Sequence, residues 1–466
     1  MRRSRSRLLA VSLLAIAASG ATRPRYGGTL RMETSSAIAS LDPAAPGAGA
    51  KERAERLIFE NLAVFDESGT LQPKLAAGWQ HDPDYRRWQI EVRAGIKFQN
   101  GQPLTSTVVA ESLRRSLTAQ NPKIYAESGH VTIETSSPSP NLLAELVKPQ
   151  NAIVLRSSSG ELSGTGPFKV AGRQEGKQIS LIANEDYWSG RPYLDGVELM
   201  LARAPRDQLL DLELGKADLV EVELDQARRV QQEGERTLSS NPSELLALVF
   251  NPGSATAKDE RVRKAIALSL DRDSIHSVFL QRQGEPSAAL LPQWMTGYAF
   301  LFPVGRDVEQ ARELQLKLPS LTLDYDFADP SARAVAERIA VNAREAGVVM
   351  QAVGENLAAR SGHGDAYITR VPLRTVDART ALENIAAALP FQAGDETERA
   401  RNSEQLFRAE GAMLSGYRII PIAHLPETYG LSARVRNWVV PEEGGWKLDE
   451  VWLESGAPAA GSQGHP

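Results

Sequence analysis

The side chains with the greatest potential for chemistry are carboxylates and a histidine that lie close together in the chain. Asp324, Asp326 and Asp329 have a spacing that could hold calcium or form an acid–base pair, and Glu442 begins a second acidic pair. His363 lies in a Gly-rich segment and has the chemistry of a metal ligand. Each pattern is more typical of a solvated loop or a helix cap. The sequence therefore predicts no catalytic residue, no metal ligand and no cofactor.

The sequence motifs of common enzyme classes are absent. It contains no Gly-x-x-x-x-Gly-Lys-Ser/Thr loop, no His-Glu-x-x-His pair and no Gly-x-Ser-x-Gly turn. Gly164 and Gly166 have the first spacing of a dinucleotide fingerprint, but Lys169 occupies the position of its third glycine. The protein is therefore expected not to be an enzyme.

The composition is that of a soluble globular protein. The 466 residues include 53 Lys+Arg and 58 Asp+Glu, and the net charge of −5 argues against nucleic-acid binding. The sequence has no cysteine, which excludes disulfides, thiolate metal sites and a lipid-modified N-terminal cysteine.

The first 21 residues have the layout of a secretory signal peptide. Basic residues from Arg2 to Arg7 precede a short apolar run, Leu8 to Ala18, and small residues follow it up to Ala21. The alternative is an uncleaved anchor or a buried N-terminal helix. We expect cleavage of residues 1–21 and a periplasmic protein that is not a lipoprotein.

Strand and helix patterns alternate along the chain, which predicts an α/β fold with mixed sheets. Alternation of apolar residues predicts strands at 88–92 and 177–183, and buried apolar runs predict strands at 245–250 and 321–325. Cap residues predict where the helices begin and end. Predicted caps are Thr105 or Ser106, Asp259, Asp271 and Asp329-Pro330 at helix starts, and Gly215 and Gly347 at helix ends.

Several short segments of the chain, taken together in their order and spacing, resemble the extracytoplasmic solute-binding proteins of ABC importers. The resemblance is to the family 5 class, which handles oligopeptides, dipeptides, nickel complexes and oligosaccharides. The resemblance is most specific over residues 26–275 and looser at 320–350 and 417–453. The segments that carry it are Tyr26–Arg31, Leu41–Pro43, Ile58–Leu62, Leu71–Trp79, Trp88–Thr105, Gly164–Phe168, Asn184–Trp188, Gly215–Leu219, Val249–Asn251, Arg261–Arg272 and Asp449–Leu453.

The resemblance implies a two-lobed periplasmic binding protein-like II fold with a third domain inserted in lobe one. A ligand would bind in the cleft between the lobes, and closure about two hinges, near 248–251 and 425–430, would trap it. It also implies delivery to an inner-membrane permease by a protein that we expect to be monomeric. The implied domains are 24–50, 161–247 and 428–455 for lobe one, 51–160 for the insert and 248–427 for a shortened lobe two.

One segment departs from the family pattern. Relatives usually carry a Gly-Trp and a later aspartate in lobe two that, in peptide binders, holds the ligand's amino terminus. Here Asp365 fits the start of that segment, the Gly-Trp is missing, and Arg370 and Arg374 lie near the aspartate position. This reversal of charge favours an anionic or neutral ligand, unless both arginines are surface residues on a shortened loop.

The candidate ligand contacts follow from the same resemblance. They are the small residues after the first strand, the segment around the two arginines, and tryptophans in loops that could stack on a ligand. Tyr187, Trp188 and the 164–167 turn are interpreted as structural. The candidates are Thr34, Ser35, Ser36, Ala37, Trp294, Thr369, Arg370, Arg374 and Trp438, with Trp446 as a further loop tryptophan.

Three functions remain open at this point. The first is an exported solute-binding protein that feeds an importer. The second is a relative with a degenerate cleft used for signalling or assembly, which the missing Gly-Trp segment favours over an intact peptide binder. The third is a hydrolase on the same scaffold, for which the sequence shows no nucleophile and base.

Overall fold

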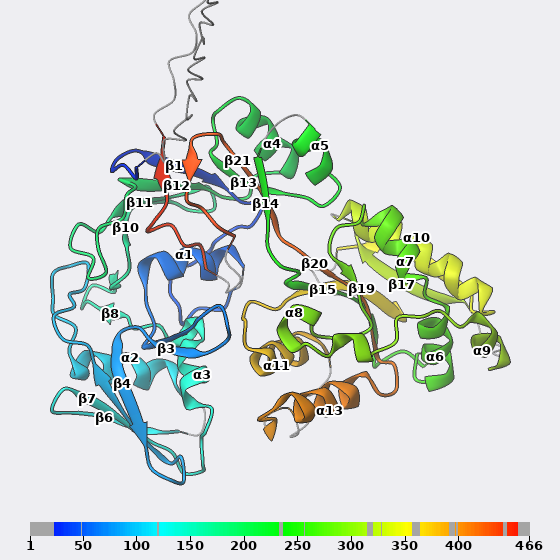
Figure 1. Cartoon of the computed structure of the whole chain (residues 1–466), viewed down its shortest axis with the longest axis horizontal. Helices are drawn as coiled ribbons and strands as arrows, with labels where there is room; N and C mark the ends of the chain where they lie inside the picture. Colours follow the sequence, from blue (N-terminus) through cyan, green and yellow to red (C-terminus); the bar gives the residue numbers. More distant parts are fainter. Residues whose placement is uncertain are drawn as a thin grey trace, which may run out of the picture.

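The computed structural model describes residues 23–47, 49–118, 121–232, 236–255, 257–314, 320–327, 329–356, 364–390, 397, 399–440 and 445–454. The predicted signal peptide, His363 and the acidic pair at Glu442 lie outside these residues. Two large mixed sheets and a smaller domain form the molecule (Figure 1). Within the described residues, no helix is both long and apolar enough to cross a bilayer, and no cluster of side chains could hold a metal ion.

The first lobe is built on a seven-stranded sheet. Its central strand, β1 (Thr29–Glu33), is parallel to both neighbours. Helix α1 (Ala50–Ile58) packs its apolar face, including Ala54 and Leu57, into the core of this sheet. The strand order is β10 (Phe168–Gln174), β11 (Gln178–Ala183), β12 (Gly196–Met200), β1, β13 (Leu219–Val222), β21 (Thr428–Leu431) and β14 (Arg236–Ser239). The lobe also contains helices α4 (Pro205–Glu213) and α5 (Ala227–Gln232) and a separate strand pair, β22 (Val435–Arg436) and β23 (Trp452–Leu453).

The inserted domain has its own core, around a four-stranded antiparallel sheet and helix α2 (Ser106–Ser116). The α2 N-cap is Thr105, whose hydroxyl accepts a hydrogen bond from Val108 N, as the sequence predicts. The sheet order is β4 (Ala76–His81), β5 (Arg87–Val92), β7 (His130–Glu134) and β6 (Lys123–Glu127), and the domain also contains β2 (Ala63–Phe65), β3 (Leu71–Pro73), α3 (Leu142–Val147), the 3-10 helix η1 (Pro149–Asn151), β8 (Leu155–Arg156) and β9 (Leu162–Ser163).

The second lobe is built on a six-stranded sheet, in which β15 (Glu244–Phe250) is the central antiparallel strand. Asp259, Asp271 and Asp329 each cap a helix, as their positions predict. The sheet order is β16 (Glu285–Pro286), β20 (Ile419–Leu425), β15, β19 (Ala366–Pro372), β17 (Leu321–Asp326) and β18 (Met350–Glu355). The helices are α6 (Glu260–Ser269), α7 (Arg272–Ser274), η2 (Ile275–Phe279), α8 (Gln293–Thr296), η3 (Ala299–Leu301), α9 (Val308–Glu313), α10 (Pro330–Glu345), α11 (Ala378–Ala388) and α13 (Ser403–Leu414).

The chain crosses between the two large sheets at residues 240–243 and 426–427. The first crossing lies earlier than expected, because residues 244–247 already pair with β19 and β20 inside the second sheet. The second crossing lies within the expected range. Arg53 of α1 reaches it, donating hydrogen bonds to Glu427 and to the hydroxyl of Tyr429, the latter at 2.7 Å.

Buried carboxylates tie distant segments together in each lobe. Asp218 is fully buried and accepts hydrogen bonds from Arg31 and Arg434. Burial alone would raise its pKa, but the two arginines outweigh this and the pKa of Asp218 is lowered. In the second lobe Glu410 accepts from the backbone of Leu290 and from the Tyr298 hydroxyl, while burial raises the pKa of Glu410 to about 7.

Candidate functional site

A pocket of about 310 Å³ lies between the second lobe and the rest of the molecule. Helix α1 and the inserted domain form one wall, with Phe65 and Lys148 among the lining residues. The end of β19 and helix α11 form the other wall, with Thr380 and Asn384. Because the two walls belong to opposite sides of the crossings, a change in lobe orientation would open or close this pocket.

Two residues on one face of α1 line the pocket. Glu52 and Arg56 are four residues apart, so they lie one above the other on the helix surface, opposite to the apolar face that packs in the first lobe. Glu52 is 3.6 Å from the guanidinium of Arg374, which projects from the second lobe. This ion pair joins the two walls of the pocket.

Arg374 has the geometry of a functional residue. Its backbone φ of 58° is in the left-handed region, which a residue with a Cβ adopts at an energetic cost. Its Nε is buried and has no hydrogen-bond partner among the described residues. The side chain keeps 30% of its surface exposed to the pocket region. The exposed part of this guanidinium, beside a pocket, can receive an oxyanion.

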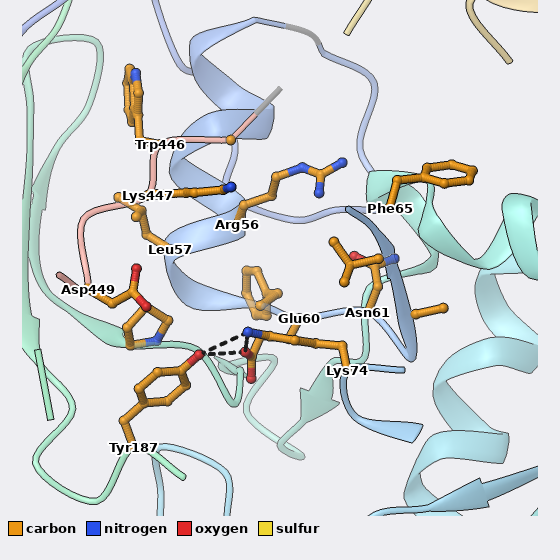
Figure 2. Close-up of a pocket in the computed structure, with 15 residues that line it drawn as sticks. Arg56, Leu57, Glu60, Asn61, Phe65, Lys74, Tyr187, Trp446, Lys447 and Asp449 are labelled. Carbon is orange, nitrogen blue, oxygen red and sulfur yellow. Dashed lines mark hydrogen bonds and ion pairs between the residues drawn. The ribbon is translucent and has the colours of Figure 1, made fainter. Parts of the chain in front are cut away.

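A second pocket, of about 340 Å³, adjoins the first, since Arg56 and Phe65 line both. Figure 2 shows that its other side is formed by the segment that carries Trp446, Lys447 and Asp449. Gly445 allows this segment to approach α1, because a Cβ there would lie 2.7 Å from Cδ of Arg56. We refer to these two neighbouring pockets together as the hollow around α1.

Glu60 organises the floor of the second pocket. Its carboxylate accepts hydrogen bonds of 2.8 Å from Thr165, Tyr187 and Trp188. Lys74 lies 3.3 Å from the same carboxylate, and Figure 2 shows Glu60 between Lys74 and Tyr187. The Tyr187 hydroxyl is held neutral, because burial and the Glu60 carboxylate raise its pKa. The Glu60 charge is therefore internally compensated, and this cluster joins the insert to the first lobe.

Positive charge predominates in the first pocket. Arg56, Lys148 and Arg374 line it, against the single carboxylate of Glu52. Lys148 also pairs with Glu145, at 2.5 Å. An anionic group that enters between α1 and β19 would therefore meet more cationic than anionic lining residues.

Comparison with known proteins identifies the family. Residues 70–388 match the family described as "Bacterial extracellular solute-binding proteins, family 5 Middle". The protein is a family 5 solute-binding protein. The family resemblance of the sequence is therefore confirmed.

Curated relatives of this solute-binding protein are similar over part of their length. The nickel-binding protein NikA of Staphylococcus aureus is 26% identical over 243 residues, which are 49% of each chain. The probable D,D-dipeptide-binding periplasmic protein DdpA of Escherichia coli is 24% identical over 327 residues, 64% of this chain and 63% of the relative. The chain thus spans about half to two thirds of the length of these relatives.

Solved structures share the fold over nearly the whole chain. The peptide complex of DppA from Helicobacter pylori has a TM-score of 0.78 at 19% identity, covering 93% of this chain and 99% of that one. NikA from Staphylococcus aureus with Ni(L-His)2 has a TM-score of 0.75 at 20% identity, covering 91% and 100%. These likenesses confirm the predicted two-lobed α/β fold of the solute-binding protein.

The structure brings two of the predicted contact residues to the walls of the two pockets, Arg374 in the first and Trp446 in the second. Thr34 and Ser35 instead turn toward the first lobe, where their hydroxyls donate to Glu221 at 2.8 Å. Ser36 donates its backbone N–H to the Thr34 hydroxyl, and Ala37 is exposed. These small residues therefore connect the segment after β1 to Glu221 of β13.

Arg370 does not present an uncompensated charge, contrary to the charge-reversal argument. Its guanidinium lies 3.0 Å from Asp329 and 3.6 Å from Glu244, and it donates to Ser331. Burial would lower the pKa of Arg370, but the surrounding carboxylates, which include Glu223 of the first lobe, raise it. The reversal at this position is neutralised within the protein.

The predicted tryptophan contacts also have structural partners. Trp438 is 3% exposed and stands edge-on to Tyr429 in the first-lobe core, so it cannot stack on a solute in this structure. Trp294 donates its indole N–H to Pro242 O, at the first crossing. Thr369 is half-buried in β19, opposite Ala247 of β15.

Glu52, Arg56 and Lys148 line the pocket but were not predicted from the sequence. The i, i+4 spacing of Glu52 and Arg56 on the polar face of a predicted helix was the available signal. The role of Glu60 as an acceptor that joins the insert to the first lobe was also not predicted, although Glu60 lies in a segment that carries the resemblance. Nothing local indicates which distant residues such a carboxylate contacts.

Proposed function

We propose that this protein captures a small solute in the hollow around α1 and delivers it to an ABC permease in the inner membrane. The observation that carries the proposal is the pocket between the lobes, in which Glu52 and Arg374 approach from opposite walls. A volume of about 310 Å³, with further space adjoining, is in the range of small-molecule sites.

Capture would work by burial and charge pairing rather than by a covalent step. A solute that bridges the walls stabilises the closed orientation, because it contacts both lobes only when they approach. Displacement of Glu52 from Arg374 by a ligand carboxylate would exchange one ion pair for another while filling the pocket. The short crossings at 240–243 and 426–427 are the segments that would absorb the rotation.

We infer that the solute carries an anionic group. Arg56, Lys148 and Arg374 outnumber the one carboxylate that lines the same pocket. Relatives include proteins named for nickel and for dipeptides, so a metal complex with carboxylate ligands or a peptide-like acid is compatible with this chemistry. The family description, extracellular, supports export. Cleavage of residues 1–21, a periplasmic location and a monomeric state form part of the proposal.

Native mass spectrometry of the protein purified from its own cell envelope tests capture directly. Any retained species is then titrated against wild type, Arg374→Gln and Arg333→Ala by isothermal calorimetry. Loss of one charge-assisted contact predicts about tenfold weaker binding for Arg374→Gln. Arg333 is a matched control, since this exposed arginine pairs only along its own helix. Equal affinity for wild type and Arg374→Gln would refute the assignment of the pocket.

The alternative is a cleft used for signalling or assembly. One observation favours it: Thr34 and Ser35 are bonded to Glu221, and Arg370 is surrounded by carboxylates, so several expected ligand groups are occupied internally. If no retained species is found, and a panel of dicarboxylates, dipeptides, sugars and nickel–histidine complexes gives no thermal shift, this alternative replaces the uptake proposal.

A further inference from the structure

A separate pocket of about 340 Å³ lies at the end of the second lobe that is remote from the crossings. Strand β15 leaves the first crossing at Glu244 and reaches the pocket at Phe250, a path of roughly 20 Å for a seven-residue strand. The pocket therefore cannot belong to the hollow around α1. Neither the family resemblance nor the proposed uptake function assigns it a role.

The charged residues that line this distal pocket are all cationic. Lys258, Arg263 and Arg418 contribute to its wall, and no carboxylate does so among the described residues. Phe250 and Pro252 provide an apolar floor and edge. Three cations around one pocket repel one another, and an anion between them would relieve that repulsion.

Arg263 is the fixed element of the pocket. The residue is only 6% exposed, and its guanidinium donates to three backbone carbonyls, those of Ala257, Lys258 and Gly416, at 2.6–2.9 Å. These bonds use Nε and Nη1, which leaves Nη2 without a protein acceptor among the described residues. A guanidinium that is held by neutral carbonyls keeps its full charge to offer to a ligand.

The electrostatic surroundings agree with this geometry. Burial and the charge of Arg418 together lower the pKa of Arg263, although Glu260 and Asp259 act in the opposite direction. Asp259 is already engaged, because it caps α6 and pairs with Arg261 at 2.6 Å. Asp259, one of the two nearest acids, is therefore already paired outside the pocket.

We propose that the distal pocket binds a small oxyanion, a phosphate or a carboxylate, between Arg263, Arg418 and Lys258. Arg263 would be the rigid anchor, whereas Arg418 and Lys258 are exposed and would close around the anion. The apolar floor would suit an organic acid with a short hydrocarbon body. The site is independent of the solute that the cleft captures.

Inorganic phosphate and succinate are the probes, titrated into the full chain by calorimetry at constant ionic strength. Arg418→Ala is expected to weaken binding of the preferred probe by about tenfold or more, and Lys258→Ala by several-fold. Both residues are exposed, so neither change should affect folding. Arg418→Lys, which keeps the charge but loses the fork, should be intermediate.

Arg374→Gln separates this site from the cleft. Binding that survives Arg374→Gln and is lost in Arg418→Ala supports the distal site, even if the uptake proposal fails. Binding that is lost in Arg374→Gln and kept in Arg418→Ala overturns it. The absence of measurable heat with both probes in wild type also overturns it.

Discussion

Replacement of Glu60 by alanine tests whether one carboxylate holds the insert on the first lobe. Glu60 accepts three hydrogen bonds of 2.8 Å, and its donors Thr165 and Tyr187 are 0% and 6% exposed. Each buried donor left without an acceptor costs about 1–3 kcal/mol. The adjoining pocket admits water to Tyr187 and Lys74, which reduces the total. We expect a loss of about 3 kcal/mol in unfolding free energy.

Urea unfolding followed by far-UV circular dichroism measures this loss, with Glu60→Gln and Tyr187→Phe as companions. Glutamine keeps one acceptor oxygen, so Glu60→Gln should lose about 1–2 kcal/mol. Tyr187→Phe removes a single donor and should lose about 1 kcal/mol. If Glu60→Ala is no more destabilising than Tyr187→Phe, the reasoning that Glu60 organises the junction is wrong.

Three further predictions concern stability. The pKa of Asp218 is lower in the folded protein than in the unfolded chain, so ionised Asp218 stabilises the fold above the ordinary aspartate pKa. This stabilisation is lost as the pH falls through the pKa of Asp218 in the folded protein. Asp218→Asn should therefore flatten the acid limb of a Tm–pH curve. The pKa of Glu410 is raised to about 7 in the folded protein, so stability falls as the pH rises from the pKa of Glu410 in the unfolded chain toward 7. Glu410→Gln should remove that fall in the same Tm–pH curve. Gly164→Ala would place a Cβ 1.8 Å from Ile58 O and should cost about 3 kcal/mol in urea unfolding, whereas Gly176→Ala, where a Cβ has open space but φ is +65°, should cost only about 1 kcal/mol.

Local features of the fold could be predicted because their causes are local. Thr105, Asp259 and Asp329 cap helices whose first N–H groups lie within three residues, so the sequence contains both partners. The apolar run predicts a strand that starts at residue 245, one residue after the observed start of β15 at Glu244. The crossing was placed too late, because the resemblance positions the hinge by motif, whereas strand pairing with β19 and β20 decides it.

The candidate site could be predicted only in part, because ligand contact depends on long-range partners. Trp438 looked available in a loop, yet Tyr429, from the strand after the second crossing, packs against it in the core. The hydroxyls of Thr34 and Ser35 follow β1 as expected, but Glu221 occupies them, from a strand nearly two hundred positions away in the chain. No pattern in the sequence records such pairings.

The two neighbouring arginines show how the fold decides which charge a ligand can use. Arg370 and Arg374 are four residues apart and have the same chemistry, but Arg370 lies in the regular strand β19, where Asp329 and Glu244 converge upon it. Arg374 lies beyond the strand end, in a left-handed conformation, with Glu52 of the opposite wall as its partner. An ion pair within one lobe persists when the lobes separate, whereas an ion pair between lobes must break. If the lobes separate as proposed, Arg374 is therefore the arginine whose charge becomes available, and we expect a solute anion to compete with Glu52 for it.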